Sequence, residues 1–96
     1  MKVVVFKKQD CGVCDRFEES LKKQIAKFGD PEKVRVEKMF MDTTDGMVLF
    51  SAANLGQIPA CVFYEDDDAE IGLDEPVASW NGRANWDQLR EMLKNN

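Results

Sequence analysis

The chain has 96 residues, of which 44% are hydrophobic and 32% are charged, and its formal net charge is −5. No apolar run approaches the roughly 18 residues of a membrane span, and the net negative charge argues against nucleic-acid binding. The length predicts one domain over residues 1–96. The N-terminal apolar run is too short for a secretory signal, so we expect a cytoplasmic protein.

The first part of the chain predicts a strand, a helix and a second strand. The continuous apolar run at residues 3–6 is typical of a strand buried on both faces. Apolar residues then recur at steps of three and four, which predicts a helix of about 14 residues that ends at Gly29. These residues are Cys14, Phe17, Leu21, Ile25 and Phe28. Glu18 and Lys22 are expected to pair on the opposite, solvent side of that helix, and residues 34–41 predict the second strand.

The middle of the chain predicts a helix followed by a third strand. Thr43, Thr44 or Asp45 can cap a helix that runs to about Leu55. A Gly-Gln-Ile-Pro segment ends that helix, and the apolar residues 60–64 follow as a strand.

An acidic loop precedes the last strand and the last helix. Residues 65–76 hold seven acidic side chains and no basic one, which favours a solvated loop over a docking surface for a basic partner. Residues 77–80 predict a fourth strand, antiparallel to the third because only this loop joins the two. Asn85 and Gln88 form a capping-box arrangement that starts the last helix.

Cys11 and Cys14 stand between the first strand and the first helix. A thiol at the first turn of a helix meets free amide donors and the helix dipole, which favour the reactive thiolate. A Cys-x-x-Cys in this context indicates a redox dithiol. A structural pair and a metal site stay open as alternatives. The chain has no histidine, so further metal ligands are limited to Cys61 and carboxylates.

The chain resembles the thioredoxin-like superfamily, of the short glutaredoxin or small-thioredoxin type. The resemblance rests on Cys11-Gly-Val-Cys14 after the first strand, Ile58-Pro59 before the third and Gly82 before the last helix. It covers nearly the whole chain. It implies an α/β, thioredoxin-like fold of the order β-α-β-α-β-β-α, in which three helices flank a four-stranded mixed sheet.

The resemblance also implies roles for these residues. Cys11 is the expected nucleophile and Cys14 the resolving thiol, and together they form a redox-active disulfide. The expected substrate-binding residues are Gly12, Val13, Ile58, Pro59 and Gly82. Pro59 is expected in the cis form, which leaves the backbone of Ile58 free to pair with a substrate strand. Gly82 is expected to line the opposite wall of the substrate groove, and glycine at position 12 to help the chain turn into the helix.

The chain departs from the family pattern around the two thiols. Asp10 and Val13 stand where thioredoxins have tryptophan and proline, and the Pro-Tyr of dithiol glutaredoxins is absent. Val5 stands where thioredoxins place a buried aspartate, so proton relay to the resolving thiol would need water or another group. Asp10 and Asp15 flank the thiols and are expected to oppose thiolate formation.

Three lysines and a third cysteine lie outside these motifs. Lys38 resembles a lysine near the active site of some thioredoxins. An ordinary solvent-facing lysine on the strand is an equally good interpretation. Lys7 and Lys8 are expected to be solvated. The alternative is that their positive charges act on the thiols or that they contact a carboxylate of glutathione. Cys61 is expected to be a small buried core residue.

The sequence therefore predicts a thiol–disulfide oxidoreductase that reduces protein disulfides through a mixed disulfide, in electron transport and cell redox homeostasis. The alternatives are a glutathione-dependent glutaredoxin and a thioredoxin-fold peptide-binding module without significant turnover. No bound cofactor or metal is expected, although glutathione is a candidate co-substrate. The expected partners are protein disulfides and a reductase or glutathione as electron donor, without nucleic acid or membrane, and the chain is expected to be a monomer.

Overall fold

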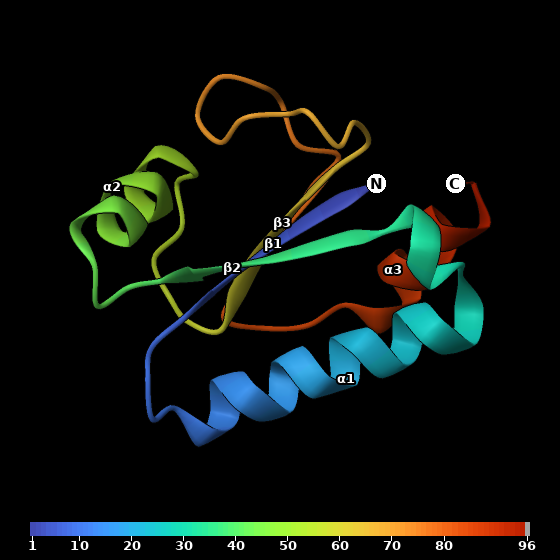
Figure 1. Ribbon diagram of the computed structural model, residues 1–96, viewed down its shortest axis with the longest axis horizontal. Helices are drawn as coiled ribbons and strands as arrows, with labels where there is room; N and C mark the ends of the chain where they lie inside the picture. Colours follow the sequence, from blue (N-terminus) through green and yellow to red (C-terminus); the bar gives the residue numbers. More distant parts are fainter. Residues whose placement is uncertain (96) are drawn as a thin grey trace.

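The computed structural model describes residues 1–95 and contains a four-stranded sheet with helices on both faces (Figure 1). The strands are β1 (Lys2–Lys7), β2 (Arg35–Phe40), β3 (Ala60–Tyr64) and β4 (Ala78–Asn81). The helices are α1 (Gly12–Phe28), α2 (Thr44–Ala52) and α3 (Trp86–Lys94), and a short 3-10 helix covers Pro31–Lys33. Helices α1 and α3 lie on one face of the sheet and α2 on the other (Figure 1). The predicted order of strands and helices is confirmed; the 3-10 turn was not predicted.

The sheet has the order β2-β1-β3-β4. Strand β1 is parallel to β2 and antiparallel to β3, and β4 is antiparallel to β3, as predicted from the loop that alone joins β3 and β4. The sheet is therefore mixed, and its strand and helix order is that of the predicted fold class.

The strand register gathers three chain segments at one end of the sheet. Phe6 pairs with Ala60, and Ala60 pairs with Asn81. The segment after β1, the segment before β3 and the segment after β4 therefore meet at this end. The acidic loop leaves the opposite end, where Phe63 pairs with Ala78.

Alternation along β1 explains why its whole apolar run is buried. Val3 and Val5 join the core beneath α1 and α3, whereas Val4 and Phe6 join the core beneath α2. Successive side chains of a strand point to opposite faces. A strand covered on both faces therefore needs apolar residues at consecutive positions.

Two helices begin at the predicted caps. Thr43 caps α2, because its Oγ1 accepts a hydrogen bond from the Gly46 amide at 3.0 Å. Asn85 caps α3, because its Oδ1 accepts a hydrogen bond from the Gln88 amide at 3.1 Å. These bonds satisfy amide donors that the first helical turn leaves unpaired.

Other boundaries and one buried residue differ from the prediction. Helix α1 has 17 residues, because it already begins at Gly12. Helix α2 ends at Ala52 instead of about Leu55, since Asn54 takes a left-handed φ of 58° that a helix cannot contain. Phe28 is 41% exposed rather than buried, and its ring lies 4.8 Å from the Arg90 guanidinium carbon, a cation–π contact.

Candidate functional site

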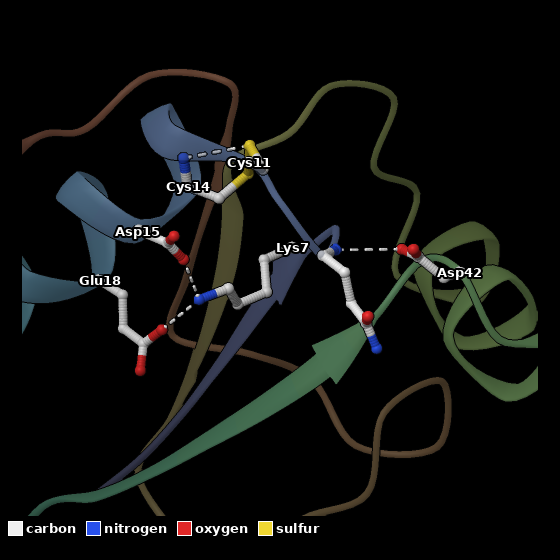
Figure 2. Close-up of a disulfide and its surroundings, with 7 residues drawn as sticks. Lys7, Cys11, Cys14, Asp15, Glu18 and Asp42 are labelled. Atoms are coloured by element: carbon white, nitrogen blue, oxygen red, sulfur yellow. Dashed lines mark hydrogen bonds and ion pairs between the residues drawn. A yellow bond between two sulfur atoms is a disulfide. The ribbon is translucent and has the colours of Figure 1, made fainter.

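Cys11 is the N-cap residue of α1, which agrees with the predicted place of a thiol at the first turn of this helix. Its Sγ accepts a hydrogen bond from the Cys14 amide at 3.2 Å. The two cysteines form a disulfide, with their Cα atoms 5.3 Å apart (Figure 2). The structure therefore describes the oxidised pair, with one sulfur placed where the amide donors and dipole of a 17-residue helix act on it.

The two cysteines differ in exposure. Cys14 is fully buried, whereas Cys11 is partly exposed and Val13, between them, is 55% exposed. Cys11 is thus the more accessible cysteine of the pair, and Cys14 is the shielded one. The arrangement can support attack by an outer thiol and resolution by an inner one.

The tight turn into α1 is made at Asp10 rather than at Gly12. Asp10 has a left-handed φ of 55°, a conformation that aspartate and asparagine tolerate better than most residues. A Cβ built on Gly12 would meet only Arg16 Nη1, at an ordinary 3.4 Å. The expectation that glycine 12 helps the chain turn is therefore wrong, and the exposed position can carry a side chain.

Pro59 and Gly82 lie in direct contact. The Ile58–Pro59 peptide bond is cis, Pro59 is buried, and partly buried Ile58 packs against the core beneath α2. The Gly82 amide donates a hydrogen bond to the Pro59 carbonyl oxygen at 3.0 Å. The fold thus brings together two motifs that lie more than 20 residues apart in the sequence.

Glycine is required at position 82 for a reason internal to the structure. Gly82 has a φ of 82°, and a Cβ there would lie 2.8 Å from the Cβ of Gln57. Side chains avoid this backbone region, and such a separation is shorter than packed carbon atoms allow.

Asn81 is a residue of this region that sequence reasoning missed. Its Oδ1 accepts hydrogen bonds from the amides of Gly56 and Gln57, at 2.9 and 2.8 Å. The side chain thereby fixes the segment that leads to Pro59 against the end of β4. The Asn-Gly dipeptide was the available signal, but it indicates a turn and gives no hint of a partner 25 residues earlier.

Lys7 is buried, and the expectation that it is solvated is wrong. It is the next residue after Val3 and Val5 on the α1 face of β1, and only 7% of its surface is exposed. Its Nζ donates hydrogen bonds to Asp15 Oδ1 at 2.6 Å and to Glu18 Oε1 at 2.7 Å (Figure 2). Lysine is rarely buried unless it is paired, and here both partners are carboxylates.

Glu18 is buried as well, so its expected place on the solvent side of α1 is also corrected. Its Oε2 lies 3.0 Å from Lys22 Nζ and 3.4 Å from Lys38 Nζ. The predicted Glu18–Lys22 pair is present, but Lys7 and Lys38 share the same carboxylate. Lys38 is therefore an ion-pair partner on β2 rather than an unpaired strand lysine, whereas Lys8 is exposed as expected.

The charges in this cluster fix the ionisation of both buried groups. Hydrogen bonds to Asp15 and Glu18 raise the pKa of Lys7 above its ordinary value, although burial opposes them. Burial alone would raise the pKa of Glu18, but hydrogen bonds and charges from Lys7 and Lys22 outweigh it and lower the pKa to about 2. Both groups are therefore ionised at neutral pH.

Cys61 is a fully buried free thiol, as predicted. It pairs with Val5 on one side and with Trp80 on the other, and burial raises the pKa of its thiol far above the ordinary value. Within residues 1–95, no three Cys, Asp or Glu side chains lie close enough to hold a metal ion. Over the same residues, no helix is both long and apolar enough to span a membrane.

No protein-family model and no curated protein matches the chain. Among solved structures, the chain is similar to thioredoxin O2 from Arabidopsis thaliana in its oxidized state. The TM-score is 0.65 and the sequence identity is 17%, and the match covers 98% of this chain and 72% of that one. The likeness shows that the chain has a thioredoxin-like fold. In this chain the Cys-x-x-Cys lies at the start of α1.

Proposed function

We propose that the chain is a thiol–disulfide oxidoreductase that reduces protein disulfides through Cys11 and Cys14. The observation that carries this proposal is the asymmetry of the pair. A partly exposed N-cap cysteine, Cys11, is disulfide-bonded to a fully buried cysteine, Cys14, in the first turn of the same helix. A purely structural disulfide has no need of one accessible sulfur at the positive end of a helix.

The reaction starts from the reduced pair. The Cys11 thiolate attacks one sulfur of a substrate disulfide, which forms a mixed disulfide and expels the other substrate sulfur as a thiolate. Cys14 then loses its proton and attacks the sulfur of Cys11, which restores the Cys11–Cys14 disulfide and releases the second substrate thiolate. The substrate gains two electrons and two protons. The protein loses two electrons and two protons. An external dithiol, a reductase or glutathione must then reduce the Cys11–Cys14 disulfide again.

The substrate chain would lie along the segment that precedes β3. Val13 offers exposed apolar surface beside the disulfide, and the cis peptide at Pro59 lies at the same end of the sheet. An extended substrate segment would pair with the backbone at Ile58, as a strand added to a sheet edge does. Gly82 would form the other side of this groove, next to Pro59.

An insulin-reduction assay with dithiothreitol as donor tests the proposal. Wild type is expected to accelerate precipitation of the reduced insulin chain, and the Cys11→Ser and Cys14→Ser variants are expected to abolish this turnover. Cys61→Ser is the matched control, because its buried thiol takes no part in the reaction. A Cys14→Ser variant should also retain substrate as a stable mixed disulfide on Cys11, identifiable by mass spectrometry.

A measured reduction potential separates the two electron donors. A value of about −270 mV would favour a thioredoxin role and one of about −200 to −230 mV a glutaredoxin role, with glutathione as co-substrate. If wild type gives no turnover with dithiothreitol, thioredoxin reductase or glutathione, the proposal fails and a peptide-binding module takes its place.

A further inference from the structure

Lys7 connects the end of β1 to the first two turns of α1. Its side chain leaves the last residue of the strand and reaches two carboxylates on the helix, below the disulfide (Figure 2). Asp15 is the residue immediately after Cys14, and its amide donates a hydrogen bond to the Cys11 carbonyl oxygen at 3.0 Å. Through Asp15, the lysine is thus hydrogen-bonded to the helical turn that contains both thiols.

The charged groups around Lys7 come from α1, from β2 and from the segments that follow β1 and β2. Asp15, Glu18 and Lys22 lie on α1, and Lys38 lies on β2. The loop after β1 adds the exposed side chains of Lys8 and Asp10, and Asp42, after β2, accepts a hydrogen bond from the Gln9 amide at 3.3 Å. In the ion-paired cluster itself, three lysines face two carboxylates, which leaves one net positive charge near the start of α1.

Asp15 would disturb the dithiol if Lys7 were absent. A carboxylate one residue from Cys14 opposes the formation of a thiolate in the same helical turn. The Asp15 side chain is 62% exposed, but its Oδ1 lies 2.6 Å from the Lys7 ammonium. Each charge therefore largely cancels the field of the other.

We infer that Lys7 is a positioning residue of the proposed reaction: it holds the first turns of α1 against β1 and neutralises Asp15, so that thiolate formation at Cys11 is not opposed. This inference rests on the proposed function of the dithiol. The lysine does not exchange protons with the thiols, because it and Glu18 both stay ionised across the neutral range. It supplies a constant positive charge and a fixed geometry.

The rate of Cys11 alkylation by iodoacetamide, measured from pH 6 to 9 on the reduced full chain, tests the inference. Lys7→Met keeps most of the buried carbon chain and removes the charge. It is expected to shift the pH profile upward and to slow alkylation at pH 7 by roughly three- to ten-fold. Lys7→Arg, which keeps the charge, is expected to stay close to wild type.

Two further variants connect the effect to Asp15. Lys7→Met combined with Asp15→Asn is expected to return the profile toward that of wild type, since the uncompensated carboxylate is gone. Lys23→Met is the matched control. Lys23 is also paired with a carboxylate of α1, but both members of that pair are exposed, and no shift in the pH profile is expected.

If Lys7→Met fails to fold, Lys7→Met combined with Glu18→Gln replaces it. This pair removes both buried charges and still leaves Asp15 uncompensated, so the same upward shift is expected. An unchanged profile in a folded Lys7→Met protein, or a shift as large in Lys23→Met, would overturn the inference. The inference would also be overturned if Asp15→Asn, added to Lys7→Met, failed to restore the pH profile of wild type. Alkylation needs no protein substrate, so a protein inactive toward insulin could still pass this test, and an active one could fail it.

Discussion

The Gly82 amide donates a hydrogen bond to the carbonyl oxygen of Pro59 at 3.0 Å, which joins the residue after β4 to the residue before β3. One position earlier, the side-chain oxygen of Asn81 accepts hydrogen bonds from the amides of Gly56 and Gln57. The two segments that flank the proposed substrate path are therefore one hydrogen-bonded unit. A change in either segment is expected to move the other.

Gly82→Ala is predicted to destabilise the protein by about 1–2 kcal/mol, because alanine is strained at a φ of 82° and its Cβ would press on Gln57. Unfolding in urea, followed by circular dichroism, measures the change. Gly56→Ala is the control, since its Cβ would meet only Asn81 Nδ2, at 4.0 Å. Equal stability of both variants would contradict the prediction.

Asn81→Ala is predicted to cost about 1–2 kcal/mol, because two backbone amides lose their acceptor. It should also raise the KM for a protein disulfide, since the segment before Pro59 loses its attachment. Asn81→Asp keeps an oxygen at the accepting position and should restore most of both losses. If Asp behaves like Ala in urea unfolding and in the insulin assay, the side-chain oxygen is not what holds the segment.

Glu18 is predicted to make stability fall at acid pH. Its pKa is lowered from 4.5 to about 2 in the folded protein, so its contribution is complete above pH 4.5 and is lost as the pH falls toward 2. Wild type should exceed Glu18→Gln in unfolding free energy by on the order of 1–3 kcal/mol at neutral pH, and the gap should narrow below pH 4.5. Glu19→Gln, which removes an exposed carboxylate, is the control. A gap that stays constant with pH would refute the prediction.

Cys61 is predicted to resist alkylation as long as the protein is folded, because its thiol is fully buried and its pKa is raised. Cys14 is buried too. Mass spectrometry after brief iodoacetamide treatment of the reduced native protein should therefore find one label, on Cys11, and three after unfolding in urea. A labelled Cys61 in the native protein would show that the core opens on the time scale of the reaction.

Local signals in the sequence were sufficient for the elements and for the thiol pair. The spacing of Cys14, Leu21 and Ile25 predicts the buried face of α1, and the Cys-x-x-Cys predicts an N-terminal sulfur because helix amides are free there. The cap at Asn85 is equally local. Such features depend on residues within one or two turns of each other, so periodicity and propensity can identify them.

The charge cluster was missed because its residues are usually found in water. Two regular patterns could have predicted it. Lys7 continues the alternation of Val3 and Val5, and Glu18 lies four residues after Cys14 on the buried face of the helix. Because Lys7 and Glu18 are charged, both were expected in solvent, although their periodicity indicates buried positions. No local pattern in the sequence predicts the contact between Asn81 and Gly56, because the pairing of β3 with β4 brings these two residues together.

The acidic loop follows the last residue of β3, whereas the segment after β1, which contains Cys11, lies at the opposite end of that strand. Figure 1 shows the loop and the start of α1 well separated. Strand β3 has five residues, which span roughly 16 Å, about two Debye lengths at physiological ionic strength. Dissolved salt therefore screens the seven carboxylates of the loop from the sulfur atoms. The net charge of −5 describes how the whole molecule repels its neighbours, whereas the thiols experience the local balance set by Lys7 and its partners.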